Sequence, residues 1–257
     1  MKVSPEQARD FRNAYGSILD GVEDYLAYRK EVGDTMLPVT DPSFSIAQPQ
    51  IVARTTEAPQ ASARREKQPA ETQLAKIAQR VASCELCPLC KKRTNTVPGQ
   101  GNPSPELMFI GEGPGAKEDE QGLPFVGQSG NLLTKMIEAM GLDRDEVFIT
   151  NIVKCRPPEN RNPASEEMDA CMPYLHEQIA ILQPKVIVAL GAVAVKGLLN
   201  VSTGISKLRG NWHSFQGIDM MPTYHPAYLL RNPPMRKDVW NDLKEVLRRI
   251  GKPVPGE

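Results

Sequence analysis

The chain has 257 residues, of which 31 are Lys or Arg and 31 are Asp or Glu, so its formal net charge is zero. With 40% hydrophobic residues this is an ordinary globular composition, which excludes a uniformly basic coat for nucleic acid but not a local basic face. No apolar run approaches the ~20 residues of a membrane span and the first residues lack a signal-peptide core, so we expect a cytoplasmic protein with no membrane contact.

The first predicted element is a helix over 4–30, within an N-terminal segment that we delimit as 1–33. Ser4 can cap this helix, and apolar residues recur from Phe11 to Tyr25 at steps of four and three. Because a lone helix must cover such an apolar stripe, it either packs on its own domain or docks onto a partner.

Residues 34–70 are rich in Ala, Ser, Thr and Gln and contain five prolines. This composition predicts a flexible linker without secondary structure of its own. Leu74, Ile77 and Val81 then fall on one face of a predicted helix. We therefore place a folded domain over 71–257.

Strands and helices alternate through this domain. The apolar patterns predict four strands, over 106–112, 147–154, 185–191 and 218–226. They also predict four helices between and after these strands, over 129–140, 164–182, 192–199 and 236–250. The alternation predicts an α/β three-layer sandwich, with a central and mainly parallel four-stranded sheet between two layers of helices. Ligands of such sheets bind at the carboxyl ends of the strands, so the loops that follow the strands should converge there.

Four of the five cysteines have a spacing that suits a metal site. Cys84 and Cys87 form a C-x-x-C pair, Cys155 follows the second strand, and Cys171 lies in the next helix. In the cytoplasm, clustered thiols indicate metal binding or redox chemistry before a structural disulfide. Four thiolates suit Zn²⁺ or an iron–sulfur cluster. Cys90 is the fifth, and by spacing alone it could compete for the same site.

The loop after the first strand has the sequence GEGPG, over 111–115. Its glycines let the backbone turn tightly and approach a ligand closely. The loop is neither a Walker loop nor a dinucleotide fingerprint, because no Gly-Lys-Ser/Thr follows and the third glycine is misplaced. Read alone, it is as readily a connecting loop as a ligand loop. Phe125, which follows it, is either a core residue or a stacking platform.

Two polar side chains lie near strand ends. Asn151 belongs to an apolar strand, where an unpaired amide is costly, so it is either a structural hydrogen-bonding group or a ligand reader. His225 precedes a proline after the fourth strand, where an ordinary surface histidine is the alternative. The apolar stretch YLL (228–230) follows, next to Arg231. An apolar wedge beside a cation is what a DNA-kinking loop needs.

Taken together and in this order, C-x-x-C, GEGPG followed by PFVG, NIVKCRPP and HPAYLLRNP resemble the iron–sulfur uracil-DNA glycosylases, family 4 of the uracil-DNA glycosylase superfamily. The resemblance covers about residues 80–250, and the combination of motifs is highly specific. It implies the fold of that superfamily and the hydrolysis of uracil from single- or double-stranded DNA in base excision repair. The alternatives are a non-catalytic iron–sulfur module that binds nucleic acid, and a zinc protein.

The resemblance implies a structural 4Fe–4S cluster, with Cys84, Cys87, Cys155 and Cys171 as its ligands. Cys90 matches no required position and is left out. We expect a monomer associated with DNA in a prokaryotic cytoplasm. Residues 1–33 are a candidate docking segment for a repair or replication protein.

The resemblance also implies how uracil is held once its nucleotide leaves the helix. Phe125 would stack on the base, and the Asn151 amide would read its O4 and N3–H. Glu118 would stand beside C5 and exclude the methyl group of thymine. His225 would donate a hydrogen bond to O2 and stabilise the departing anion.

Two further groups of residues complete the implied site. Glu112 and Gly113 would place the attacking water near C1′. An apolar wedge, formed by Tyr228, Leu229 and Leu230, would fill the gap of the flipped base. Four cations would bind DNA phosphates, namely Lys154, Arg156, Arg209 and Arg231.

Overall fold

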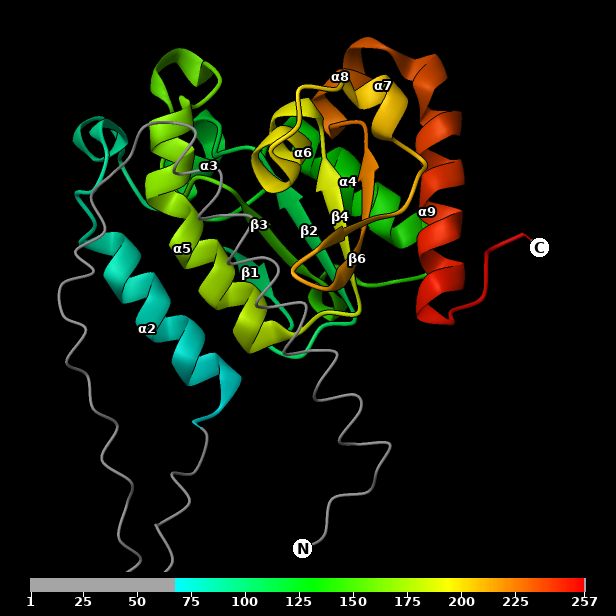
Figure 1. Ribbon diagram of the computed structural model, residues 1–257, viewed down its shortest axis with the longest axis horizontal. Coiled ribbons are helices and arrows are strands. Elements are labelled where there is room, and N and C mark those ends of the chain that lie inside the picture. The colour runs from blue at the N-terminus through cyan, green and yellow to red at the C-terminus, as the bar shows by residue number, and fades with distance from the viewer. Residues whose placement is uncertain (1–67, 257) are drawn as a thin grey trace, which may run out of the picture. The chain divides into compact units, whose positions relative to one another are not determined.

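The computed structural model of the protein describes residues 68–256. The predicted helix over 4–30 and nearly all of the linker over 34–70 lie outside the described residues, and the boundaries of these two segments stay predictions. The described chain folds into a six-stranded sheet with helices on both faces (Figure 1). The predicted α/β fold is thereby confirmed.

The sheet has the strand order β1-β3-β2-β4-β6-β5. Its strands are β1 (Gln100–Gly101), β2 (Leu107–Gly111), β3 (Phe148–Asn151), β4 (Val186–Leu190), β5 (His213–Phe215) and β6 (Ile218–Thr223). The four predicted strands are the parallel ones, β2, β3, β4 and β6, while β1 and β5 add antiparallel edges. The predicted strand number is thus two short, because edge strands of two and three residues leave no periodic pattern in the sequence.

Eight α-helices and four short 3₁₀-helices connect the described strands. The α-helices are α2 (Ala70–Ala82), α3 (Ala116–Gln121), α4 (Gln128–Ala139), α5 (Ser165–Leu182), α6 (Ala192–Leu199), α7 (Ile205–Leu208), α8 (Pro226–Arg231) and α9 (Arg236–Ile250), and the 3₁₀-helices are η1 (Pro88–Lys91), η2 (Arg144–Glu146), η3 (Pro158–Asn160) and η4 (Pro233–Met235). The four helices predicted over 129–140, 164–182, 192–199 and 236–250 are confirmed to within a residue at either end, whereas the short α3, α7 and α8 were not predicted. No helix of the described part is long and apolar enough to cross a bilayer.

Two hydrophobic cores cover the two faces of the sheet. Because side chains alternate along a strand, Met108 and Ile110 of β2 point toward α2, α5 and α6, while Leu107 and Phe109 point toward α4 and α9. The central strands are therefore buried on both faces and read as continuous apolar runs. Both faces of the sheet are filled by packing, which leaves the strand ends for a ligand.

The connections place one strand end at a switch in direction. The chain runs from β2 through α4 to β3, and then returns through α5 to β4 on the other side of β2. Helix α4 packs on one face of the sheet and α5 on the other. In open α/β sheets ligands bind at the carboxyl ends of the strands at such a switch point.

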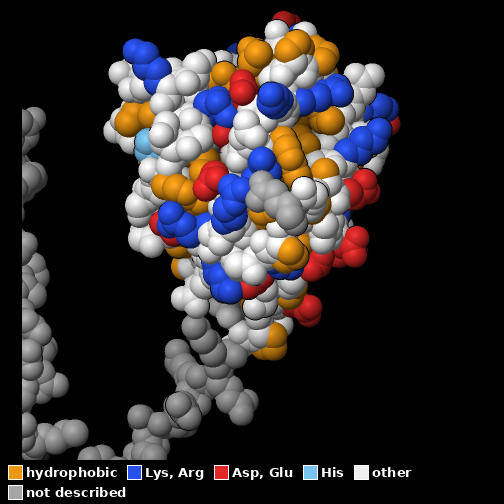
Figure 2. Space-filling model, turned by 90° about the vertical axis from the view of Figure 1, so that its right-hand side faces the viewer, with side chains coloured by type: hydrophobic (Ala, Val, Ile, Leu, Met, Phe, Trp, Pro, Cys, Tyr) orange, Lys and Arg blue, Asp and Glu red, His pale blue; other side chains and the backbone are white. Residues whose placement is uncertain are grey.

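The side of the molecule near α9 carries charges of both signs (Figure 2). Arg248 pairs with Glu245 and Arg249 pairs with Asp219 on this side. Mixed charge of this kind does not form a continuous basic surface for a phosphate backbone. This side of the molecule is therefore a poorer candidate for the functional site than the strand ends.

Candidate active site

A pocket of about 460 Å³ opens where the carboxyl ends of β2, β3 and β6 meet. Its volume lies in the range of small-ligand sites. Eight of the residues predicted from the sequence line it, namely Glu112, Gly113, Glu118, Phe125, Asn151, His225, Tyr228 and Arg231. They come from three separate strand ends and meet because parallel strands end at the same edge of the sheet.

Asn151 is the last residue of β3 and is almost fully buried, with 1% of its surface exposed. Its Oδ1 is buried and has no hydrogen-bond partner in the protein. A Cβ atom at Gly111 would lie 2.4 Å from this oxygen and 2.6 Å from Cζ of Phe125, so glycine is required for the amide and ring to pack this closely. A buried unpaired acceptor is unfavourable by about 1–3 kcal/mol, which a ligand N–H would relieve.

Phe125 is buried and belongs to the core beside α4, and it also lines the pocket. The core alternative is therefore confirmed, and stacking on a ligand stays a prediction for the part of the residue that lines the pocket. The ring centroid lies 5.6 Å from that of His225, with 34° between the planes. The two rings and the Asn151 amide thus border one space.

Glu118 of α3 is 7% exposed and lines the pocket. Its Oε1 accepts hydrogen bonds from the backbone N–H groups of Val126 and Gly127, each at 2.9 Å. The carboxylate therefore fixes the loop that carries Phe125. Its predicted place beside C5 of a base stays a prediction.

His225 precedes α8 as its N-cap residue, and its Nδ1 accepts the N–H of Ala227 at 3.1 Å. Burial and, to a smaller extent, the charge of Arg231 lower the pKa of the imidazole to about 4, and Glu118 opposes the shift. At neutral pH the ring is therefore uncharged. Because Nδ1 is an acceptor, the ring proton lies on Nε2, which is left to donate to a ligand.

Glu112 follows β2 and lines the pocket together with Gly113. Burial raises the pKa of the Glu112 carboxyl. Its main chain is fixed, because the N–H of Val153 donates to its carbonyl at 3.1 Å. The main chain of Glu112 is therefore held at the pocket wall.

Only two of the three residues of the predicted apolar wedge are exposed. Tyr228 and Leu230 are exposed by 37% and 39%, whereas Leu229 is 1% exposed and belongs to the core. The stretch forms α8 instead of a loop, and successive helical residues point about 100° apart, so neighbours face different surroundings. The prediction that Leu229 contacts DNA is wrong for this reason.

Lys154 is wrongly predicted as a phosphate contact, because it is completely buried. Its Nζ donates to Thr150 Oγ1 at 2.7 Å, to the main-chain carbonyl of Asn151 at 2.7 Å and to Gln178 Oε1 at 2.8 Å. All three ammonium protons are therefore used inside the protein. Burial lowers the pKa of Lys154 to about 8.

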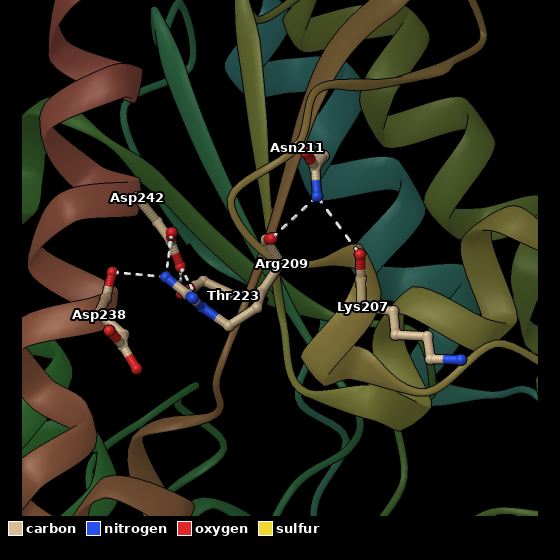
Figure 3. A network of polar contacts seen from close by, with 6 residues as sticks. All are labelled: Lys207, Arg209, Asn211, Thr223, Asp238 and Asp242. Carbon is tan, nitrogen blue, oxygen red and sulfur yellow. Dashed lines mark hydrogen bonds and ion pairs between the residues drawn. The ribbon is translucent and has the colours of Figure 1, made fainter.

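Arg209 is also turned inward, toward α9 (Figure 3). It forms an ion pair with Asp242, and its Nη2 donates to the Asp238 carbonyl at 2.7 Å. Thr223 Oγ1 donates to the same Asp242 carboxylate at 2.6 Å. The predicted phosphate contact of Arg209 is therefore wrong, whereas Arg156, which is partly exposed, keeps that prediction.

Eight further residues line the pocket without having been named as site residues from the sequence, although two of them belong to the GEGPG loop. They are Pro114, Gly115, Ser129, Pro157, Asn160, Arg161, Asn162 and Ala227. The segment 157–162 supplies half of them, and its polar run ENRN after two prolines was the available signal. Arg161 within it pairs with both oxygens of Glu167, at 2.8 and 2.7 Å.

All five cysteines line one second cavity, bounded by α2, η1, the segment after β3 and α5. Cys90 borders it together with the four predicted ligands, Cys84, Cys87, Cys155 and Cys171. Burial raises the pKa of the Cys87, Cys155 and Cys171 thiols, that of Cys171 to about 11. The thiols are therefore protonated at neutral pH unless a metal displaces their protons.

Two N–H donors point at these sulfurs. Arg93 Nη1 donates to Cys155 Sγ and the backbone N–H of Lys154 donates to Cys171 Sγ, both at 3.3 Å. Such donors stabilise thiolates bound to a metal. The sequence reasoning missed Arg93, whose guanidinium also bonds the carbonyls of Ala82 and Cys84 at 2.8 and 2.9 Å.

The cysteine thiols line one cavity without surrounding a single point. In the part of the chain that the structure describes, no three His, Cys, Asp or Glu side chains converge on one metal position. Four thiolates suit a zinc ion or an iron–sulfur cluster. The cavity that they line encloses about 10 Å³.

A mainly parallel sheet with a pocket at the carboxyl ends of its strands defines an α/β protein with room for a small ligand at the usual place. Residues 98–244 match the family described as the uracil DNA glycosylase superfamily. The type-4 uracil-DNA glycosylase of Sulfurisphaera tokodaii is 50% identical over 182 residues, which cover 67% of this chain and 83% of that protein. That of Thermotoga maritima is 45% identical over 182 residues, 68% of this chain and 94% of that protein.

A type-5 uracil-DNA glycosylase, from Pyrobaculum aerophilum, is 32% identical over 170 residues, which cover 60% of this chain and 74% of that protein. Identity to the type-4 proteins is higher and extends over more of their length. The chain therefore belongs to the type-4 family of the uracil DNA glycosylase superfamily. The resemblance predicted from the four sequence motifs is confirmed.

Proposed function

We propose that this protein is a uracil-DNA glycosylase of base excision repair, which hydrolyses the N-glycosidic bond of deoxyuridine in DNA and leaves an abasic site. One observation carries the proposal. The buried side-chain oxygen of Asn151, Oδ1, has no partner within the protein, and Asn151 lines a pocket that Phe125 and His225 also border. A pyrimidine with an N–H group at its ring edge would complete that arrangement.

The Asn151 amide discriminates between pyrimidines. Its carbonyl accepts the N3–H of uracil and its NH₂ donates to O4, so both polar groups are satisfied. Cytosine presents an unprotonated N3 and an amino group at these positions, which leaves donor against donor and acceptor against acceptor. The enzyme therefore rejects cytosine through its own buried amide.

Phe125 provides the plate on which the flipped base stacks. Glu118 closes the pocket where C5 of the base would stand, so the methyl group of thymine meets a carboxylate already bonded to the Val126 and Gly127 N–H groups. A group held in this way cannot swing aside for a larger base. Thymine is excluded by lack of room.

The bond that breaks joins N1 of uracil to C1′ of the sugar. Uracil takes the bonding electron pair and its negative charge spreads to O2, where the neutral His225 donates from Nε2. Water adds its oxygen to C1′ while its proton passes to the Glu112 carboxylate or to solvent. Glu112 and Gly113 hold that water on the pocket wall, and the uracil anion is protonated after release.

The duplex is gripped beside the pocket. Tyr228 and Leu230 fill the gap left by the flipped base, while Arg231 and Arg156 bind phosphates. Uracil-containing DNA, single- or double-stranded, is the partner that these groups suit. A monomeric state, a cytoplasmic location and a docking role for residues 1–33 stay predictions.

We further infer that Cys84, Cys87, Cys155 and Cys171 hold a 4Fe–4S cluster. When bound, the cluster supplies a structural cross-link between the segment before β1, the end of β3 and α5, with no redox step in the reaction. Anaerobically purified protein should be brown and contain about four iron and four sulfide per chain. Colourless protein with one zinc per chain would support the zinc alternative instead.

The proposed activity is tested with an oligonucleotide that carries one uracil, in single- and double-stranded form. Incubation followed by alkali should cleave the strand at the abasic site, and an oligonucleotide with thymine or cytosine at that position should stay intact. Binding without cleavage above background would favour the non-catalytic module. Nothing in the described residues favours that module, since Asn151 and His225 line the same pocket.

A further inference from the structure

Phe125 has an unusual backbone conformation for a stacking ring. Its φ angle is 52°, in the left-handed region that residues with bulky side chains rarely adopt. Such a conformation persists only where neighbouring groups fix it from several sides, and it is found mainly at functional sites. The groups that hold Phe125 in place are therefore part of the working site.

Charged side chains fix the peptides on both sides of Phe125. Before it, Arg144 Nη2 donates to the Pro124 carbonyl at 2.6 Å. After it, the Glu118 carboxylate accepts the N–H groups of Val126 and Gly127. Together these hydrogen bonds determine where the loop enters and leaves the strained residue.

The third support comes from α4, on which the loop rests. A Cβ atom at Gly130 would lie 2.0 Å from the Phe125 carbonyl, so the helix and the loop touch backbone to backbone. Arg144 connects the same helix to the loop, because its Nη1 donates to Thr134 Oγ1 at 3.0 Å. Arg144 follows α4 in η2 and is not among the residues that line the pocket.

We propose that Arg144 is a positioning residue, which keeps the Phe125 ring against the base by holding the Pro124 carbonyl to α4. The inference rests on the proposed function and deepens it. Without the guanidinium, the 124–126 segment relaxes toward an ordinary φ angle and the ring leaves the pocket wall. Uracil binding and excision then fall, while contacts with the DNA backbone, which other residues make, are retained.

The test compares Arg144→Met with the wild-type chain, using Arg249→Met as the matched control. Arg249 is an exposed arginine of α9 that pairs with Asp219. We expect Arg144→Met to slow single-turnover excision by roughly 10–100-fold and to weaken inhibition by free uracil by a similar factor. Its affinity for DNA with an abasic site should stay within about twofold of wild type, because that complex contains no base to stack.

Arg144→Lys keeps the charge but reaches only one of the two partners, so its excision rate should lie between those of Arg144→Met and wild type. If Arg144→Met does not fold, Arg144→Lys decides the matter alone. A folded Arg144 variant with wild-type excision and wild-type uracil inhibition overturns the inference, as does equal loss in Arg249→Met. Wild-type protein that releases no uracil overturns the proposed function itself, and the inference with it.

Discussion

The base pocket and the cysteine cavity both use the segment that follows β3, yet they differ in how far the protein alone completes them. The pocket is open, with about 460 Å³ of space and with Phe125 and His225 each fixed by hydrogen bonds of the surrounding chain. The cysteine cavity encloses about 10 Å³ and its buried thiols have raised pKa values. The pocket has room for a small ligand, whereas the cavity has almost none, and its buried thiols would have to lose their protons to bind a metal.

One buried residue connects the two regions. The Lys154 ammonium donates to the main-chain carbonyl of Asn151, and the Lys154 backbone N–H donates to Cys171 Sγ. The residue proposed to read the base and a proposed cluster ligand therefore share one hydrogen-bonding neighbour.

The largest expected effect is confined to the pocket. His225→Ala removes the donor to O2 and should slow excision by about 100-fold or more, and Asn151→Ala should have an effect of similar size. Iron content and melting temperature should change little, because the pocket is held by other contacts. His176→Ala, which alters an exposed histidine of α5, is the control. Similar losses in all three variants would contradict the assignment.

The second effect separates the cavity from the pocket. Cys171→Ser should reduce iron and sulfide to background and lower the melting temperature by roughly 10 °C, because metal binding contributes directly to folding. Cys90→Ser should retain the cluster. Iron analysis and thermal unfolding check both variants. Loss of iron from Cys90→Ser would mean that Cys90 is a ligand and that one of the four proposed cysteines is wrongly assigned.

Lys154→Met tests the connection between the regions. It leaves the acceptors on Thr150, Asn151 and Gln178 without a buried partner, so we expect destabilisation of about 1–3 kcal/mol. Urea unfolding measures the stability, and iron content and excision should fall together. The salt dependence of DNA binding should not change, since a buried ammonium touches no phosphate. A reduced salt slope would mean that Lys154 reaches the DNA after all.

A pH effect follows from His225, whose pKa is about 4 in the folded protein and about 6.5 when unfolded. Between these values the unfolded chain binds the proton and the folded one does not, so stability falls as pH falls from about 6.5 to 4. The loss at pH 5 should be at most about 2 kcal/mol. Urea unfolding at pH 7 and pH 5 measures it, and His225→Gln should show a smaller difference between the two pH values.

The smallest effect concerns the surface. Arg231→Gln should lower the slope of log affinity against log salt by about one, because one phosphate contact is lost. Lys185→Gln, at the opposite end of the sheet before β4, should leave the slope unchanged. Equal slopes for wild type and Arg231→Gln would remove Arg231 from the DNA interface.

The sequence predicted the parallel strands and long helices because their apolar periodicity is local and survives without knowledge of the fold. It also predicted which loops converge, since Gly111 and Asn151 end parallel strands of the sheet and His225 follows another. The two edge strands escaped because two or three residues carry no period. Helix α8 was not predicted, because YLL was interpreted as a loop. In a loop the three side chains need not point in different directions, whereas in a helix Leu229 turns into the core.

By itself, then, the sequence determined the sheet, the motif order and the family of this protein. Only the tertiary structure decided where individual side chains point. Lys154 and Arg209 are cations in any reading of the sequence, yet one is enclosed by three acceptors and the other is bound to Asp242 of α9. The role of Arg144 depends on the same thing, because a side chain's partner is set by packing between segments distant in the chain, which no local pattern records.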